Sequence, residues 1–108
     1  MPEPGAITVV PIHGDVDLNT SDHFAQTIQQ AVGPCPPVLV LDMTGVSFMS
    51  LTGLAVLIAT EHQTREAGVE LRLAASQRAV LRPIQISGLT EVFDIYPTVA
   101  DSARVGPS

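Results

Sequence analysis

The stretch Val46-Ser-Phe-Met-Ser-Leu-Thr-Gly-Leu-Ala-Val-Leu-Ile58 decides how the rest of this chain is interpreted. It follows a continuous apolar run, Val38-Leu-Val-Leu41, which Asp42 closes. A short apolar run of this kind, preceded here by Pro36-Pro37, is typical of a strand buried on both faces. After Ser50 the apolar residues follow helical spacing. We therefore expect a strand, a short loop and then a helix.

The expected helix has recognisable ends. Ser50 or Thr52 supplies an N-cap oxygen, and Gly68 lies where a left-handed C-cap residue belongs. Unpaired N–H groups and the helix dipole favour an anion at the N-terminus, so a hydroxyl there is able to carry a phosphate. Local chemistry alone favours the simpler interpretation, in which the hydroxyls are caps and Gly53 permits close packing.

The N-terminal third predicts a strand, a turn and a helix. Pro11 interrupts the strand Ile7–Val10 and confines it to a sheet edge or a bend. His13-Gly14-Asp15 predicts a turn into a second short segment, Val16–Leu18. Helical spacing follows the cap-rich Asn19–Asp22, and Gly33–Pro37 ends that helix. Its apolar positions are Phe24, Ala25, Ile28, Ala31 and Val32.

The second half continues the alternation. Val69–Leu73 alternates as a strand does, and Ser76 opens a helix that Pro83 should bend or break and Gly88 should end. Val92–Ile95 predicts a last strand, and Pro97–Arg104 a brief terminal helix.

The fold class expected is α/β, or mixed α+β. Strands that alternate with helices imply a mostly parallel or mixed sheet of four to five strands, with about four helices packed on it. We expect a single domain over residues 6–104, a flexible N-terminal tail over 1–5 and a flexible C-terminal tail over 105–108.

Composition indicates a small, folded, acidic protein. The 108 residues suit one domain, and 45% hydrophobic content with a mean hydropathy of +0.32 argues against disorder. Five arginines, no lysine and eleven acidic residues give a net charge of −6. This charge argues against nucleic-acid binding, which needs a basic patch, while it permits a basic partner surface. Solubility alone is the favoured explanation of the acidity.

The sequence favours a cytoplasmic location. Cys35 is the single cysteine, so no internal disulfide forms, as is usual in a reducing compartment. We expect its thiol to be inert, with an intermolecular disulfide as the alternative. The N-terminus Met-Pro-Glu-Pro-Gly does not have the pattern of a signal peptide, and no apolar stretch approaches the ~20 residues of a membrane helix.

Catalytic motifs are absent. No Gly-x-Gly-x-x-Gly, Walker or Gly-x-Ser-x-Gly motif occurs. His13, His23 and His62 lie in three separate elements, without the spacing of metal ligands, and His62 is expected on a helix surface. For Asp15 and Asp17, hydrogen bonding in a turn is favoured over paired carboxylate catalysis. We expect no enzyme activity, no cofactor and no metal.

Three segments together resemble a STAS domain, the fold of the bacterial anti-sigma factor antagonists. Ile12–Leu18 is similar to the family's early Gly-x-Leu/Val-Asp turn. Val38–Leu54 is similar to its central strand and signature loop. Ser87–Phe93 is similar to its late Ser/Thr-Gly-Leu segment. The resemblance covers roughly residues 7 to 104, and the order and spacing of the segments make it fairly specific.

One position departs from the family pattern. The family's loop typically has the order Asp-Ser-Ser/Thr-Gly-Leu, and its first Ser is phosphorylated by the partner kinase. Here the loop is Ser50-Leu-Thr-Gly-Leu54, so Leu51 stands in the phosphoacceptor position and Ser50 replaces the acidic residue. The standard phospho-switch is therefore expected to be lost. Ser50 or Thr52 as a new acceptor, and control by abundance, are the alternatives.

The resemblance implies a function in transcription regulation. An anti-sigma factor antagonist binds an anti-sigma factor of the serine-kinase type and releases the sigma factor. The contact surface would be the 47–53 loop, the start of the following helix and the nearby acidic turn. The expected partner-binding residues are Asp15, Asp17, Ser47, Met49, Ser50, Leu51, Thr52 and Gly53.

Two further functions fit the same resemblance. Some STAS-like small proteins are accessory subunits of a lipid-transporting ABC ATPase, and Thr52 would then be a contact residue. A small ligand at the same helix terminus is the third interpretation. A homodimer is compatible with the sequence. The apolar residues Ile84, Ile86 and Leu89 fit either the core or an interface, and we expect the core.

Overall fold

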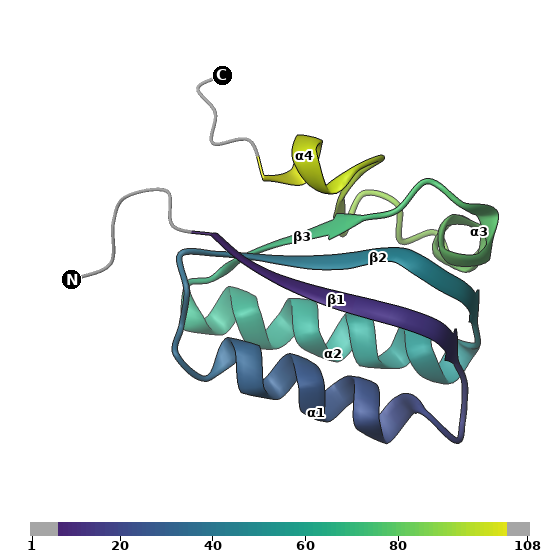
Figure 1. Cartoon of the computed structure of the whole chain (residues 1–108), viewed down its shortest axis with the longest axis horizontal. Coiled ribbons are helices and arrows are strands. Elements are labelled where there is room, and N and C mark those ends of the chain that lie inside the picture. The colour runs from purple at the N-terminus through teal and green to yellow at the C-terminus, as the bar shows by residue number, and fades with distance from the viewer. Residues whose placement is uncertain (1–6, 104–108) are drawn as a thin grey trace.

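The structure, a computed structural model, describes residues 7–103 as strands that alternate with helices (Figure 1). The expected tails 1–5 and 105–108, the domain limits 6 and 104, and the expected end of the last helix at Arg104 lie outside these residues. In chain order the elements are β1 (Ile7–Val16), α1 (Ser21–Val32), β2 (Val38–Met49), α2 (Leu51–Ala67), β3 (Glu70–Ala74), α3 (Arg78–Ile86), β4 (Asp94–Tyr96) and α4 (Val99–Ser102).

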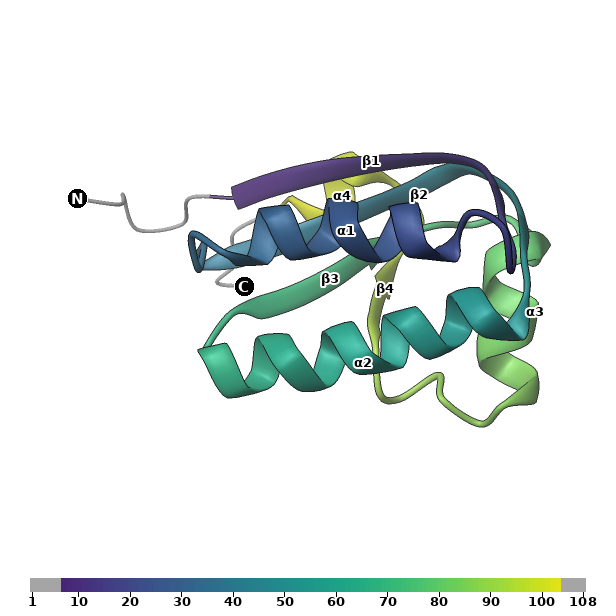
Figure 2. The same cartoon turned by 90° about the horizontal axis from the view of Figure 1, so that it is seen from below.

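The sheet is parallel. Its order is β1-β2-β3-β4, and each neighbouring pair runs in the same direction. Helices α1 and α2 lie side by side on one face, and α4 lies on the opposite face (Figures 1 and 2). Helix α3 stands at the end of the sheet where β2 finishes. The predicted α/β class is confirmed, with four strands and four helices between residues 7 and 103.

The central strand β2 is buried on both faces, as its apolar run predicts. Leu39, Leu41 and Met43 belong to the large core cluster on the side of α1 and α2. Val38 and Val40 belong to a second, smaller cluster, against which Val99 of α4 packs. Successive residues of a strand point to opposite faces, so a continuous apolar run is needed where both faces are covered.

The expected break in the first strand is wrong. Strand β1 continues from Ile7 to Val16 through Pro11 and the residues expected to form a turn, although its pairing with β2 is irregular after Pro11 and after Gly14. Pro11 is tolerated because β1 is an edge strand, where a missing N–H leaves no ladder bond unmade. Gly14 has a φ of +78°. This left-handed residue lies at the second irregularity in the pairing, within a continuous strand and not in a turn.

Strand β2 is also longer than its apolar run. It was expected to close at Asp42, and it continues to Met49 because β1 accompanies it as far as the pair Val16–Met49. The expected loop between strand and helix is therefore reduced to Ser50.

Helix α3 continues past its proline. Ser76 was expected to open this helix, which instead begins at Arg78, and Pro83 leaves it unbroken to Ile86. Pro83 removes one N–H bond to the carbonyl of Ala79, while the burial of Val80 and Ile84 holds the helix against the core. Gly88, with a φ of +73°, ends the helical course as predicted.

Candidate partner-binding site

The turn from β2 into α2 is a single residue, Ser50. Its backbone is extended, with φ −82° and ψ 174°, and its side-chain oxygen accepts a 3.4 Å hydrogen bond from the N–H of Gly53. Of the two N-cap candidates, the structure therefore selects Ser50 over Thr52. The other predicted end is confirmed too, because Gly68 is left-handed with a φ of +75° and its N–H bonds to carbonyls of the last turn.

Leu51 and Thr52 form the first turn of α2. Leu51 is 74% exposed. Leucine cannot cap a helix, so capping does not explain why this residue stands at the helix start. Thr52 is half-buried, and its hydroxyl makes no hydrogen bond to any residue between 7 and 103. An apolar side chain thus extends into solvent at the start of α2.

Gly53 is required by a close approach of β1 and β2 to the helix. A Cβ atom on Gly53 would lie 2.7 Å from Cγ1 of Val16 and 2.9 Å from Cγ of Met49. Both neighbours are buried, so neither can move without disturbing the core. The missing side chain lets α2 begin directly above the end of the sheet.

The acidic residues lie on the other side of the same turn. Ser47 donates a 3.0 Å hydrogen bond to a carboxylate oxygen of Asp15, so the predicted proximity of the acidic segment to the 47–53 segment is present in the fold. Asp17 has a structural function, because its Oδ1 accepts hydrogen bonds from the N–H groups of Asn19 (2.9 Å) and Thr20 (3.2 Å). These bonds are the turn hydrogen bonding expected for Asp17, whereas the carboxylate of Asp15 accepts its bond from Ser47 of β2 instead.

An apolar groove of about 530 Å³ lies between this turn and α3. Residues 48–51 form one wall, and apolar atoms make up most of the lining. Phe48 is 50% exposed and Ile86 is 74% exposed. We call this hollow the apolar groove. Its second wall is one side of α3 with the following residue: Arg78, Ala79, Arg82, Pro83, Ile86 and Ser87.

The second wall carries positive charge. Arg78 and Arg82 are exposed, and neither forms an ion pair with any of the residues 7–103. No aspartate or glutamate lines the apolar groove. The site therefore combines exposed apolar side chains with two cations, in a protein whose net charge is −6.

Gln77 holds the two walls together. Its side-chain nitrogen donates hydrogen bonds to the carbonyls of Met43 (2.6 Å), in the middle of β2, and Val46 (2.8 Å), nearer its end. Its side-chain oxygen accepts a 3.1 Å bond from the N–H of Ser76. Since Gln77 directly precedes α3, these bonds fix that helix relative to the strand that carries Phe48.

The predicted site residues do not share one hollow. Residues 49–51 border the apolar groove, whereas Asp15 borders a separate pocket of about 320 Å³ between β1 and α1, which His13 and His23 also line. Met49 and Gly53 are buried, and Ser47 is exposed. Their part in an interface stays a prediction.

The residues of the second wall are not among the site residues predicted from the sequence. Ile86 was expected in the core with Ile84 and Leu89, and it is exposed whereas Ile84 is fully buried. Residues two apart on a helix lie on different faces, and this signal was available.

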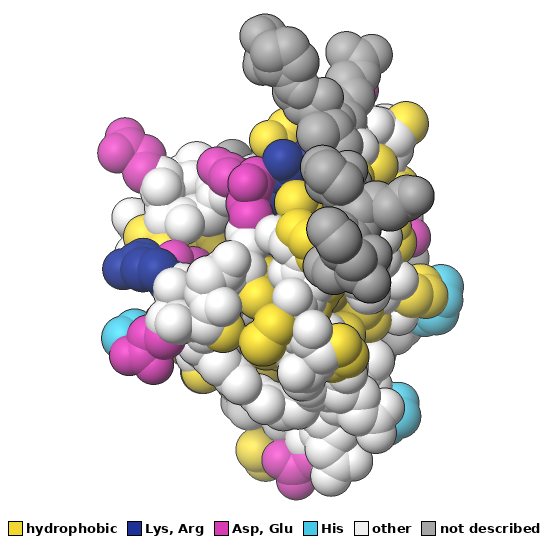
Figure 3. All heavy atoms as spheres, turned by 90° about the vertical axis from the view of Figure 1, so that its left-hand side faces the viewer, with side chains coloured by type: hydrophobic (Ala, Val, Ile, Leu, Met, Phe, Trp, Pro, Cys, Tyr) yellow, Lys and Arg dark blue, Asp and Glu magenta, His cyan; other side chains and the backbone are white. Residues whose placement is uncertain are grey.

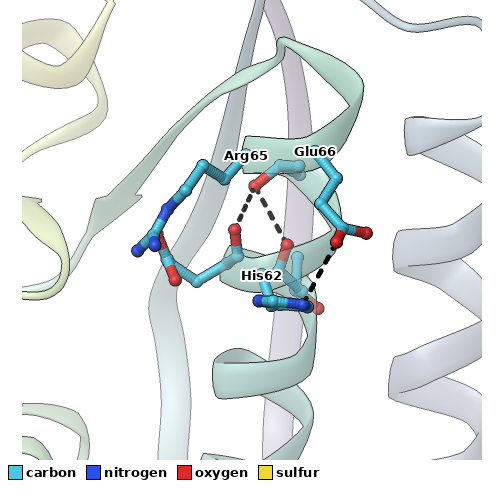
Figure 4. Close-up of polar contacts among 6 residues, drawn as sticks. His62, Arg65 and Glu66 are labelled. Carbon is cyan, nitrogen blue, oxygen red and sulfur yellow. Dashed lines mark hydrogen bonds and ion pairs between the residues drawn. The ribbon is translucent and has the colours of Figure 1, made fainter.

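The remaining polar residues offer no competing site. His62 lies exposed on α2, 3.4 Å from Glu66 at the next turn, as expected of a surface residue (Figure 4). Cys35 is exposed and has a φ of +53°. Between residues 7 and 103 no three His, Cys, Asp or Glu side chains gather to hold a metal ion. No helix in that part of the chain has the length and apolar character needed to cross a bilayer.

Curated relatives of this chain are named as anti-sigma factor antagonists. The anti-sigma-F factor antagonist RsfB of Mycobacterium tuberculosis is 30% identical over 96 residues, which cover 89% of this chain and 78% of that protein. The anti-sigma-B factor antagonist of Listeria monocytogenes is 27% identical and covers 78% of this chain and 74% of its own length.

Solved structures agree on the fold. An anti-sigma factor antagonist from Mycobacterium paratuberculosis superposes with a TM-score of 0.77 at 30% identity, over 94% of this chain and 95% of that one. A sulfate transporter family protein from Wolinella succinogenes reaches 0.76 at 18% identity, over 95% and 84% of the two chains, and so shares the fold. The family model for the STAS domain matches residues 1–102. This chain therefore belongs to the STAS domain family.

Proposed function

We propose that this protein is an anti-sigma factor antagonist, which binds an anti-sigma factor of the serine-kinase type in the cytoplasm and so releases a sigma factor. The relatives from Mycobacterium tuberculosis and Mycobacterium paratuberculosis, both 30% identical, support the class of function. The observation that carries the proposal is the exposed apolar turn, where Leu51 and Phe48 extend into solvent at the end of β2.

The physical argument is the cost of that exposure. Burying apolar surface contributes about 25 cal/mol per Å², so two large side chains gain several kcal/mol when a partner covers them. Contiguous exposed apolar side chains commonly mark protein interaction sites. The first turn of α2 contains no acidic residue, so no fixed charge opposes the approach of an apolar partner surface. We infer that the contact includes Ser47–Gly53 and the start of α2.

The test is release of a sigma factor from its inhibitor. The anti-sigma factors encoded with this protein are purified singly, each is loaded with its fluorescently labelled sigma factor, and this protein is titrated in. We expect one complex to lose its sigma factor, as measured by fluorescence anisotropy. If no complex responds, the proposal is contradicted.

We further infer that the standard phospho-switch is lost. Leu51 has no hydroxyl, Ser50 is engaged as the N-cap and Thr52 is half-buried. A phosphate on an interface hydroxyl adds close to two negative charges and separates partners, so its loss would leave the protein permanently competent to bind. A new acceptor at Ser50 or Thr52 and control by abundance are the alternatives.

The matched variant for this inference is Leu51→Ser, which restores the hydroxyl. After incubation with the partner kinase and ATP, the variant should gain about 80 Da, the mass of a phosphoryl group, while the natural protein stays unchanged. Addition of this mass to the natural protein, mapped to Thr52, would contradict the loss of the switch.

The absent hydroxyl at position 51 also favours a second candidate, the accessory subunit of a lipid-transporting ABC ATPase, with Thr52 as a contact residue. Tagged protein captured from its own cells separates the two functions. A membrane ATPase as the stoichiometric partner supports transport, whereas a soluble anti-sigma factor supports the main proposal. Sedimentation of the purified protein at several concentrations tests whether a homodimer forms.

A further inference from the structure

Helix α3 presents two unlike sides. Val80 and Ile84 are fully buried and fix the helix on the core. Arg78, Arg82 and Ile86 recur at intervals of four residues, which places them one above the other on a single exposed side. Nothing within residues 7–103 covers this side, although it is the wall of a formed groove.

The apolar groove extends beyond the β2–α2 turn to helix α3. Its volume of about 530 Å³ lies within the range of specific ligand pockets, about 300 to 1,000 Å³. Leu51 and Ile86 are both exposed and stand on opposite walls, so an occupant can pack against both at once. A shallow apolar groove with walls of this kind is the shape that receives one face of an amphipathic helix.

The positive charge of the second wall favours an acidic occupant of the apolar groove. Of the four arginines in residues 7–103, Arg65 and Arg72 pair with Glu61 and Glu70. Arg78 and Arg82, in contrast, have no carboxylate partner in that part of the chain. Two unpaired guanidinium groups beside an apolar surface favour an occupant that carries carboxylates next to its apolar side chains.

The same charges disfavour a second copy of this chain. A two-fold dimer formed through the apolar groove would use the same surface of both copies, so that four arginines would share one interface. Like charges placed together across an interface cost several kcal/mol. No acidic residue lines the apolar groove to offset this repulsion.

We propose that the apolar groove receives an acidic amphipathic helix of the anti-sigma factor, whose apolar side chains pack between Leu51 and Ile86 while its carboxylates bind Arg78 and Arg82. This inference rests on the proposed function and extends the contact from the β2–α2 turn to α3. Gln77 then has a positioning function, because it holds α3 at a fixed distance from β2.

The test uses the anti-sigma factor that releases its sigma factor in the titration described above. Its affinity for the full chain is measured by isothermal titration calorimetry for the double variant Arg78→Glu/Arg82→Glu and for Ile86→Ser. The control is Arg65→Glu, an exposed arginine near the other end of α2. Glutamate is favourable in the first turn of a helix, so the substitution of Arg78 should leave α3 folded, which circular dichroism checks.

We expect the double variant to lower the affinity about thirtyfold or more, since charge pairs at interfaces are strongly coupled. Arg65→Glu should stay within about twofold, as is usual for charges outside a contact. Hydrogen exchange on the anti-sigma factor should show protection of one helix that contains carboxylates. Changing those carboxylates to lysine should restore binding to the double variant.

Three results would overturn the inference. If both α3 variants bind normally while Leu51→Asp abolishes binding, the groove proposal fails and the proposed function stands. If no anti-sigma factor binds the natural protein, both proposals fail. If the chain dimerises, and Ile86→Ser dissociates the dimer without changing the affinity for the anti-sigma factor, the occupant is a second copy.

Discussion

The two ends of helix α2 differ in how far residues of this chain satisfy them. At the C-terminal end, Arg65 pairs with Glu61 at 2.6 Å, and the hydroxyl of Thr64 donates to the carbonyl of Thr60 at 2.9 Å (Figure 4). Gly68 then closes the helix in the left-handed conformation. At the N-terminal end, Ser50 provides one capping bond, and Leu51 is left exposed beside the apolar groove.

The difference extends to the whole molecule. Figure 3 shows the end where the strands begin, where acidic and a few basic side chains lie around apolar patches on the described surface. Charged side chains at such a surface are well solvated, and their ion pairs contribute little to stability, about 0 to 1 kcal/mol each. The end where β2 finishes instead exposes Phe48, Leu51 and Ile86. Under the proposed function, the end where β2 finishes would gain free energy when a partner covers these side chains.

The largest effect should come from a charge placed at the exposed turn. Leu51→Asp should lower the affinity for the anti-sigma factor about a hundredfold, as is typical of a central interface residue. The matched control, Ala67→Asp, puts the same charge on the exposed last residue of α2 and should stay within about twofold. Calorimetric titration measures both. Equal losses in the two variants would remove the distinction between the ends.

Identical substitutions of two glycines should differ in stability. Gly53→Ala should cost about 2 to 3 kcal/mol, because the new methyl group meets Val16 and Met49 in the core. Gly68→Ala meets nothing within 4 Å and should cost about 1 kcal/mol for its positive φ alone. Urea unfolding measures both free energies. A larger loss at Gly68 would show that the close approach at Gly53 is unimportant.

A glutamine pair offers a smaller contrast. Gln77→Leu removes the donors to the carbonyls of Met43 and Val46 and should cost about 1 to 2 kcal/mol. Gln63→Leu removes two bonds to Gln29, of 2.6 and 2.9 Å, that are exposed to water, and should cost under about 0.5 kcal/mol. Thermal unfolding of the two variants compares them. If Gln77→Leu proved as mild as the control, the two walls of the groove would not depend on this side chain.

The smallest effects belong to the ion pairs of α2. Glu66→Gln removes the partner of His62, and both side chains are largely exposed, so the change in unfolding free energy should stay within about 0.5 kcal/mol. Glu61→Gln, which loses the pair with Arg65, should cost more, up to about 1 kcal/mol, because the side chain of Glu61 is only 18% exposed. Urea unfolding in low and high salt measures both. A loss above 1 kcal/mol would mean that this end depends on its charges.

Sequence patterns were sufficient where local chemistry decides the structure. The apolar run of β2 predicted a doubly buried strand. Gly68 marked the C-terminal end of α2 and two hydroxyl residues, Ser50 and Thr52, its start, because capping and left-handed positions restrict residue type strongly. The same patterns failed where a distant partner decides. Strand β2 continues through polar residues to Met49 only because β1 runs beside it, and Pro11 stays in β1 only because that strand lies at an edge.

The candidate site likewise has one part that the sequence indicates and one part that depends on the fold. The 47–53 segment was visible from the resemblance, and its departure at Leu51 could be located in the sequence. The wall formed by Arg78, Arg82 and Ile86 was not, since it exists only after α3 has been placed beside the end of β2. Gln77, which makes that placement, has no sequence signature. Contacts between residues more than thirty positions apart follow from the fold and not from spacing.

The most direct test of the central claim is a titration of ¹⁵N-labelled protein with the unlabelled anti-sigma factor, followed by amide chemical shifts. The account predicts shifts at Ser47–Gly53 and along Arg78–Ser87, with Glu61–Gly68 at the other end of α2 unchanged. Shifts concentrated at Glu61–Gly68, with the β2–α2 turn unaffected, would contradict it and move the binding surface to the opposite end of the helix.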